Sequence, residues 1–186
     1  MVHVGNRDGA YDPSLVQKIR EATAVWLSGG EQQRLSDRYV GTPIEKELHA
    51  LLARGGVVGG TSAGAAIASS TMLSSTKTSI LNGMDEPVFA EGMQFLPSTI
   101  IDQHFSQRKR QGRLIKAIEA YPDRIGVGID ESTGLFVNQD RSRVVGNGGV
   151  YLLKAGSFPD ISERSFEGYQ RFQAGDVLDT RVLERE

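Results

Sequence analysis

Residues 55–67 read Gly-Gly-Val-Val-Gly-Gly-Thr-Ser-Ala-Gly-Ala-Ala-Ile, a short β-branched run that passes into a tract of small residues. The pattern predicts a strand, a sharp turn and a helix, with Ser62 at the turn inside a G-x-S-x-G motif. Gly60 and Gly64 remove the side chains that would clash where strand and helix approach closely. Ser62 Oγ would then stand at a helix N-terminus, which favours developing negative charge. We predict a nucleophile elbow here; the alternative is a Gly/Ala-rich turn with an incidental serine.

Around this motif, alternating segments predict an α/β sheet with helices on both faces. Four apolar or β-branched runs read as strands, and three amphipathic runs read as helices. The strands are expected at Ala24–Leu27, Val57–Val58, Phe95–Ile101 and Ile125–Ile129, and the helices near residues 12–21, 44–52 and 114–118. Short runs at residues 135–137, 143–145 and 150–153 predict antiparallel hairpins. Residues 71–91 are rich in Ser, Thr, Gly and Asn and predict a loop with short strand pieces.

Size and composition restrict the functional classes. The 186 residues predict a single domain over 1–186, with a polar C-terminal segment at 157–186. A formal net charge of −2 with mixed charges gives no reason to expect nucleic-acid or membrane binding. The absence of cysteine excludes disulfides, thiolate metal sites and a cysteine nucleophile. No signal-peptide pattern opens the chain, so a cytoplasmic location is expected, and we expect no metal and no cofactor.

Polar groups follow several predicted strands, and in an open α/β sheet these carboxyl ends share one edge. Ser62, His104 and the Gly29-Gly30 turn therefore suggest acyl transfer by a serine, a histidine base and backbone oxyanion donors. His104 is the natural base, because the other two histidines lie near the N-terminus and inside a predicted helix. The orienting carboxylate could be Glu131, Asp130 or Asp102, and spacing does not choose among them.

A basic cluster follows His104. Its members are Arg108, Lys109, Arg110 and Arg113. Such clusters are commonly solvated helix starts. The helix dipole disfavours cations at this end, however, which favours a functional reason such as holding a carboxylate of the substrate.

Three segments together resemble the cyanophycinase family of serine peptidases. These are Gly60-Thr61-Ser62-Ala63-Gly64-Ala65, Asp102-Gln103-His104-Phe105-Ser106-Gln107-Arg108 and Gly126-Val127-Gly128-Ile129-Asp130-Glu131. The family is related to peptidase E and to class I glutamine amidotransferase-like folds, and the resemblance extends from about Arg7 to Leu153. The middle segment is far more specific than G-x-S-x-G, and it favours the cyanophycinase branch over the dipeptidase branch.

The resemblance implies a three-layer α/β/α sandwich with a mostly parallel, flavodoxin-like sheet. It implies a catalytic triad of Ser62, His104 and Glu131, with oxyanion donors at Gly30 and Ala63. The substrate site would include Gln32, Asp102, Gln103, Arg108 and Arg113. The implied reaction is hydrolysis of cyanophycin, a poly-aspartate with arginine on each β-carboxyl, to β-aspartyl-arginine dipeptides. A peptidase for other aspartyl or isoaspartyl peptides is the alternative enzyme.

The chain departs from the family pattern in two places. Glu31 follows the Gly-Gly turn where the family usually has aspartate, which is a small change. The family also has β/α units before the point where this chain begins, so we expect an exposed sheet edge, uncovered apolar surface and a homodimer. A truncated relative that binds a peptide or a partner without turnover is the corresponding non-enzymatic alternative.

Overall fold

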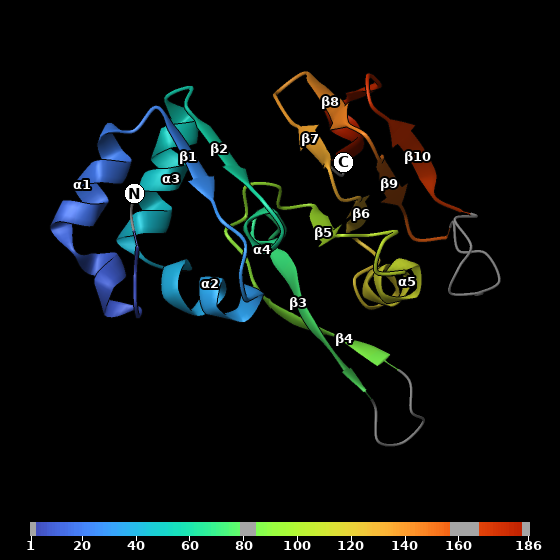
Figure 1. The fold of residues 1–186 in the computed structure, drawn as a ribbon, viewed down its shortest axis with the longest axis horizontal. Coiled ribbons are helices and arrows are strands. Elements are labelled where there is room, and N and C mark those ends of the chain that lie inside the picture. The colour runs from blue at the N-terminus through green and yellow to red at the C-terminus, as the bar shows by residue number, and fades with distance from the viewer. Residues whose placement is uncertain (1–2, 79–84, 157–167, 184–186) are drawn as a thin grey trace.

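The computed structural model describes residues 3–78, 85–156 and 168–183, in which helices and strands alternate (Figure 1). The helices are η1 (Asp8–Tyr11), α1 (Pro13–Glu21), α2 (Gln32–Tyr39), α3 (Pro43–Ala53), α4 (Ala63–Ala66), α5 (Gln111–Ala120) and η2 (Thr180–Leu183). The strands are β1 (Ala24–Leu27), β2 (Val57–Gly60), β3 (Thr71–Thr78), β4 (Asp85–Glu91), β5 (Thr99–Gln103), β6 (Ile125–Ile129), β7 (Thr133–Phe136), β8 (Arg141–Gly146), β9 (Gly149–Leu153), β10 (Gln170–Gln173) and β11 (Val177–Asp179).

The N-terminal half is built on the parallel pair β1–β2. Val25 and Val58 pack against a core to which α1 contributes Ile19 and α3 contributes Leu48. Because side chains alternate across a strand, Trp26 lies on the opposite face of this pair from Val25. Trp26 is 68% exposed.

The C-terminal half is built on a second sheet, in the order β10-β9-β6-β5. Strands β5 and β6 are parallel, whereas β9 and β10 join antiparallel. Helix α5 covers one face, where Leu114 packs with Ile100. On the other face, Val127 packs with Val144 of β8 and Leu178 of β11.

The α/β fold class is therefore confirmed, with a specific arrangement of strands. Parallel pairing occurs at β1–β2 and β5–β6, and the later strands pair antiparallel. In the C-terminal half the second face of the sheet is covered by the small sheet β11-β8-β7 rather than by a helix. The predicted hairpins at 135–153 account for this cover, since β7 and β8 pair antiparallel from Thr133↔Gly146 to Phe136↔Arg143.

Residues 71–91 form more structure than the sequence predicts. Strands β3 and β4 pair antiparallel from Thr71↔Glu91 to Thr78↔Asp85, with a bulge at Leu73/Ser75, and the hairpin projects from the body (Figure 1). The prediction of a loop with short strand pieces was wrong for both arms, and residues 79–84 lie outside the described part. Low hydrophobicity concealed these strands, because Ser and Thr dominate β3 and no clear alternation appears.

The C-terminal segment is partly described. Residues 168–183 form β10, β11 and η2, whereas residues 157–167 and 184–186 lie outside the described part of the chain. Within the described ranges, no helix combines the length and the apolar composition needed to cross a bilayer.

Candidate active site

Ser62 lies at the predicted elbow, between β2 and α4. Its backbone has φ 53° and ψ −115°, in a left-handed region that non-glycine residues rarely adopt. A Cβ on Gly60 would overlap the carbonyl of Gly64, and a Cβ on Gly64 would overlap the carbonyl of Leu27. The two motif glycines thus let helix α4 lie directly on strands β1 and β2, and the turn between them fixes the position of Ser62.

The Gly29-Gly30 turn lies beside this elbow. A Cβ built on Gly29 would be 3.3 Å from Ser62 Cβ and 3.9 Å from its Oγ, so a side chain there would crowd the serine. Gly30 has φ 149°, which also favours glycine. Ala63 is the first residue of α4, and its N–H belongs to the helix end that lacks an intrahelical acceptor. Gly30 and Ala63 are the positions at which the family resemblance implies oxyanion donors.

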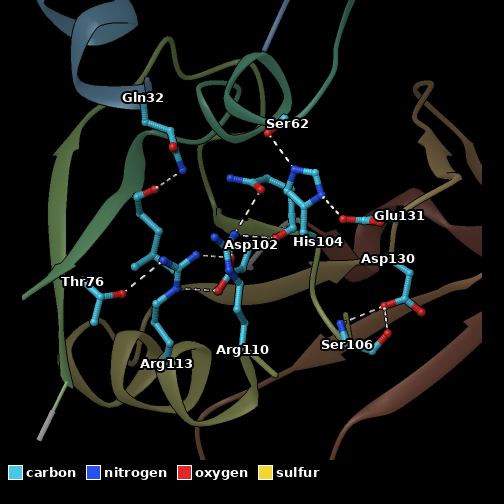
Figure 2. A network of polar contacts seen from close by, with 12 residues as sticks. Gln32, Ser62, Thr76, Asp102, His104, Ser106, Arg110, Arg113, Asp130 and Glu131 are labelled. Atoms are coloured by element: carbon cyan, nitrogen blue, oxygen red, sulfur yellow. Dashed lines mark hydrogen bonds and ion pairs between the residues drawn. The ribbon is translucent and has the colours of Figure 1, made fainter. Parts of the chain in front are cut away.

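The structure brings Ser62, His104 and Glu131 into one hydrogen-bonded chain (Figure 2). Ser62 Oγ lies 2.9 Å from His104 Nε2, and His104 Nδ1 lies 2.7 Å from Glu131 Oε1. An ionised carboxylate can only accept, so the proton on the imidazole resides on Nδ1. Nε2 is then free to accept the hydroxyl proton of Ser62, which is the arrangement that nucleophilic catalysis by serine requires.

The two other carboxylates considered from the sequence, Asp130 and Asp102, do not contact the imidazole; Asp130 is bound to the neighbouring loop and to β9, and Asp102 to two arginines. Asp130 is buried, and its Oδ1 accepts from the Ser106 N–H at 3.0 Å and from Ser106 Oγ at 2.6 Å. Its Oδ2 accepts from the Gly149 N–H at 3.0 Å and the Tyr151 hydroxyl at 3.2 Å. Burial, and then the charge of Asp130, raise the pKa of Tyr151, which keeps its proton for this bond. Of the three candidates, Glu131 is the one in contact with the imidazole.

This geometry predicts that Asp130→Asn mainly lowers stability. Each carboxylate oxygen accepts two hydrogen bonds, so an amide NH2 in either place would face donors. We expect the free energy of unfolding to fall by about 1–3 kcal/mol. Urea titration followed by circular dichroism measures the change, with exposed Asp123→Asn as the control. An unchanged unfolding midpoint would contradict the structural role.

Beneath His104, Asp102 is completely buried and pairs with two arginines (Figure 2). Arg110 Nη1 donates to Oδ1 at 3.1 Å, and Arg113 Nε donates to Oδ2 at 2.9 Å while its Nη2 contacts Oδ1. Arg110 also donates to the carbonyl and the side-chain Oε1 of Gln103. Burial lowers the pKa of the Arg110 guanidinium, and the charge of Asp102 offsets part of this. Asp102, Gln103 and Arg113 are therefore joined in one network that Arg110 completes.

Arg108 differs from these neighbours. It is exposed, and its guanidinium makes no bond to the rest of the described chain. It borders a hollow of about 320 Å³ that is rich in cations. The lining residues are Thr76, Arg108, Lys109, Arg110, Gly112, Arg113 and Lys116. Thr76 extends from the β3 arm and accepts a 3.3 Å bond from Arg113.

Gln32 lies at the start of α2, where its amide donates to the Leu73 carbonyl of β3 at 3.1 Å. It therefore ties α2 to the hairpin beside the site. The sequence did not indicate Thr76, because β3 was not predicted as a strand. It also did not single out Gln107, whose side chain accepts the Glu131 N–H.

In the described ranges, no cluster of three or more histidine, aspartate or glutamate side chains has the geometry to hold a metal ion.

The model of peptidase family S51 matches residues 6–145. The chain belongs to peptidase family S51. Within that family it is similar to the cyanophycinase of Synechococcus elongatus, with 38% identity over 177 residues that cover 94% of this chain and 53% of the relative. The cyanophycinase of Geminocystis herdmanii is 32% identical, with 96% of this chain and 64% of the relative covered. The chain spans about half the length of the first of these relatives.

More distant similarities agree with the fold. Peptidase E of a Nostoc strain is 27% identical over 146 residues, covering 74% of this chain and 58% of the relative. The crystal structure of a peptidase from an acI-B1 actinobacterium has a TM-score of 0.68 and 25% identity, with 94% of this chain and 66% of the other covered. A peptidase E from Listeria monocytogenes, at TM-score 0.54 and 17% identity over 74% of this chain and 66% of the other, agrees in fold alone.

Proposed function

We propose that this chain is a serine peptidase that hydrolyses cyanophycin to β-aspartyl-arginine dipeptides. The observation that carries the proposal is the contact chain at the elbow, with 2.9 Å from Ser62 Oγ to His104 Nε2 and 2.7 Å from His104 Nδ1 to Glu131. Membership of the S51 family and similarity to cyanophycinases support the substrate.

In the proposed reaction, His104 Nε2 takes the Ser62 proton while Oγ bonds to the backbone carbonyl of a β-linked aspartyl unit. The N–H groups of Gly30 and Ala63 hold the resulting oxyanion. The C–N bond then breaks, and His104 returns its proton to the leaving amine. Water attacks the acyl-enzyme by the same route in reverse, which releases the carboxylic acid and restores Ser62. Glu131 holds the imidazole tautomer and stabilises the imidazolium throughout.

The cationic hollow gives a reason for substrate choice. An arginine joined to aspartate through its α-amino group keeps a free α-carboxylate, so every unit of the polymer carries one. Arg108 is exposed and free to form a bidentate pair with such a group. Arg110 and Arg113, held by Asp102, add fixed positive charge at the edge of the same hollow.

The direct test incubates purified protein with insoluble cyanophycin and follows release of β-aspartyl-arginine by mass spectrometry. The expected product is the dipeptide, with none from a Ser62→Ala sample prepared in parallel. Faster cleavage of an α-aspartyl dipeptide than of the polymer would instead favour a peptidase of peptidase E type, to which the chain is also similar. No cleavage of either substrate by folded protein would favour a binding role.

Arg108→Ala is expected to reduce kcat/KM on cyanophycin by about 30-fold, which corresponds to about 2 kcal/mol of lost charge pairing. The effect should be much smaller on an aspartyl amide that lacks the arginine carboxylate. Arg143→Ala is the matched control, since Arg143 is an exposed arginine on β8. Equal activity of the Arg108 variant and the wild type on the polymer would remove Arg108 from the substrate site.

A further inference from the structure

Glu131 is unusually exposed for a residue that must hold an imidazole. Its side chain is 49% exposed, compared with 24% for His104. An exposed glutamate ordinarily samples several rotamers, and a surface ion pair alone restrains it weakly. Its position 2.7 Å from Nδ1 therefore depends on how firmly its backbone is held.

The backbone of Glu131 is held from the loop that carries His104. The Glu131 N–H donates to the side-chain Oε1 of Gln107 at 3.0 Å. On its other side, the Glu131 carbonyl accepts from Thr133 Oγ1 at 3.0 Å. The next residue, Ser132, has φ 53°, so the chain turns sharply just after the acid.

A second set of hydrogen bonds joins the same two loops, with the donors now on the His104 loop. Asp130, from the Glu131 loop, accepts from the N–H and the hydroxyl of Ser106, from the His104 loop. Ser106 and Gln107 are adjacent, as are Asp130 and Glu131, so the two loops are joined by a reciprocal pair of side-chain contacts. The Phe105 N–H also donates to the Ile129 carbonyl at 3.1 Å where the loops leave β5 and β6.

We propose that Gln107 is a positioning residue for the triad, which fixes the Glu131 backbone so that the exposed carboxylate stays on His104. The proposal deepens the proposed function and rests on it. A glutamine suits this place because its side-chain oxygen reaches and accepts the Glu131 N–H. Asp130 holds the loops together as a buried structural anchor, whereas Gln107 acts on the acid itself.

The test compares Gln107→Met, which keeps length but removes the acceptor, with Gln107→Glu, which keeps an acceptor in place. Gln107→Met is expected to lower kcat about tenfold with KM within twofold of wild type. It should also weaken the low-field proton NMR signal of the His104 Nδ1–H bond to Glu131 in the substrate-free protein. Gln107→Glu should retain both the rate and the signal, and Gln17→Met on α1 is the surface control.

The proposal is overturned if Gln107→Met keeps the wild-type kcat and signal, or if Gln107→Glu loses as much as Gln107→Met. Thermal unfolding and the NMR spectrum verify that each variant is folded. Because the NMR signal is measured without substrate, it tests the positioning role of Gln107 even if the protein proves inactive on cyanophycin.

Discussion

Ser62→Ala is expected to lower kcat on cyanophycin by at least about a thousandfold, because it removes the atom that bonds to the substrate carbonyl. The fold should be retained, since the change deletes one oxygen and the same left-handed φ already holds a Cβ there. Steady-state kinetics and the thermal midpoint measure the two effects. A serine-reactive phosphonate should label the wild type and not the variant.

The control for this experiment is Ser14→Ala. Ser14 is an exposed serine in the first turn of α1, and its backbone N–H, rather than its hydroxyl, donates to Asp12. If Ser62→Ala keeps more than about a tenth of the wild-type rate, Ser62 is not the nucleophile. Labelling of a different residue by the phosphonate would lead to the same conclusion.

Glu131→Gln is expected to reduce kcat by about 10²–10⁴ with little change in KM. The neutral amide cannot stabilise the imidazolium, and it can turn its NH2 toward Nδ1 and impose the wrong tautomer. The substrate contacts are untouched, which is why KM should hold. Kinetics over a range of cyanophycin concentrations separates the two parameters, and exposed Glu119→Gln on α5 is the control.

Comparison with Asp130→Asn makes this prediction selective. Rates are normalised to the folded fraction, because Asp130→Asn is expected to destabilise the protein. If Asp130→Asn then loses more kcat than Glu131→Gln, the orienting carboxylate has been assigned to the wrong neighbour.

The elbow could be predicted from sequence because its determinants are local. Gly60 and Gly64 each meet a steric need of one turn, and that need is visible in the order of residues around Ser62. The β3–β4 hairpin could not be predicted, because its strands are stabilised by pairing with each other rather than by an apolar pattern. Likewise, the strand cover over β6 depends on long-range packing of Val127 with Leu178.

The same contrast applies within the site. Asp130 and Glu131 are adjacent, so spacing could not show which one faces His104 and which one faces the interior. Arg108, Arg110 and Arg113 form one basic run in the sequence, yet two of them, Arg110 and Arg113, pair with buried Asp102. The Gln107 contact depends on two loops that are 24 residues apart in the chain, and no local pattern marks it.

Trp26, on the exposed face of β1, can serve as an intrinsic fluorescence probe. The chain contains a single tryptophan, so selectively excited indole emission comes from Trp26 alone. This ring lies over Gly59 of the nucleophile strand and is largely in water, which gives long-wavelength, easily quenched emission. Any surface that covers it, including the expected second copy of the chain, should shift the emission to shorter wavelength and protect it from iodide. Association through this face of β1 can thus be followed without a label.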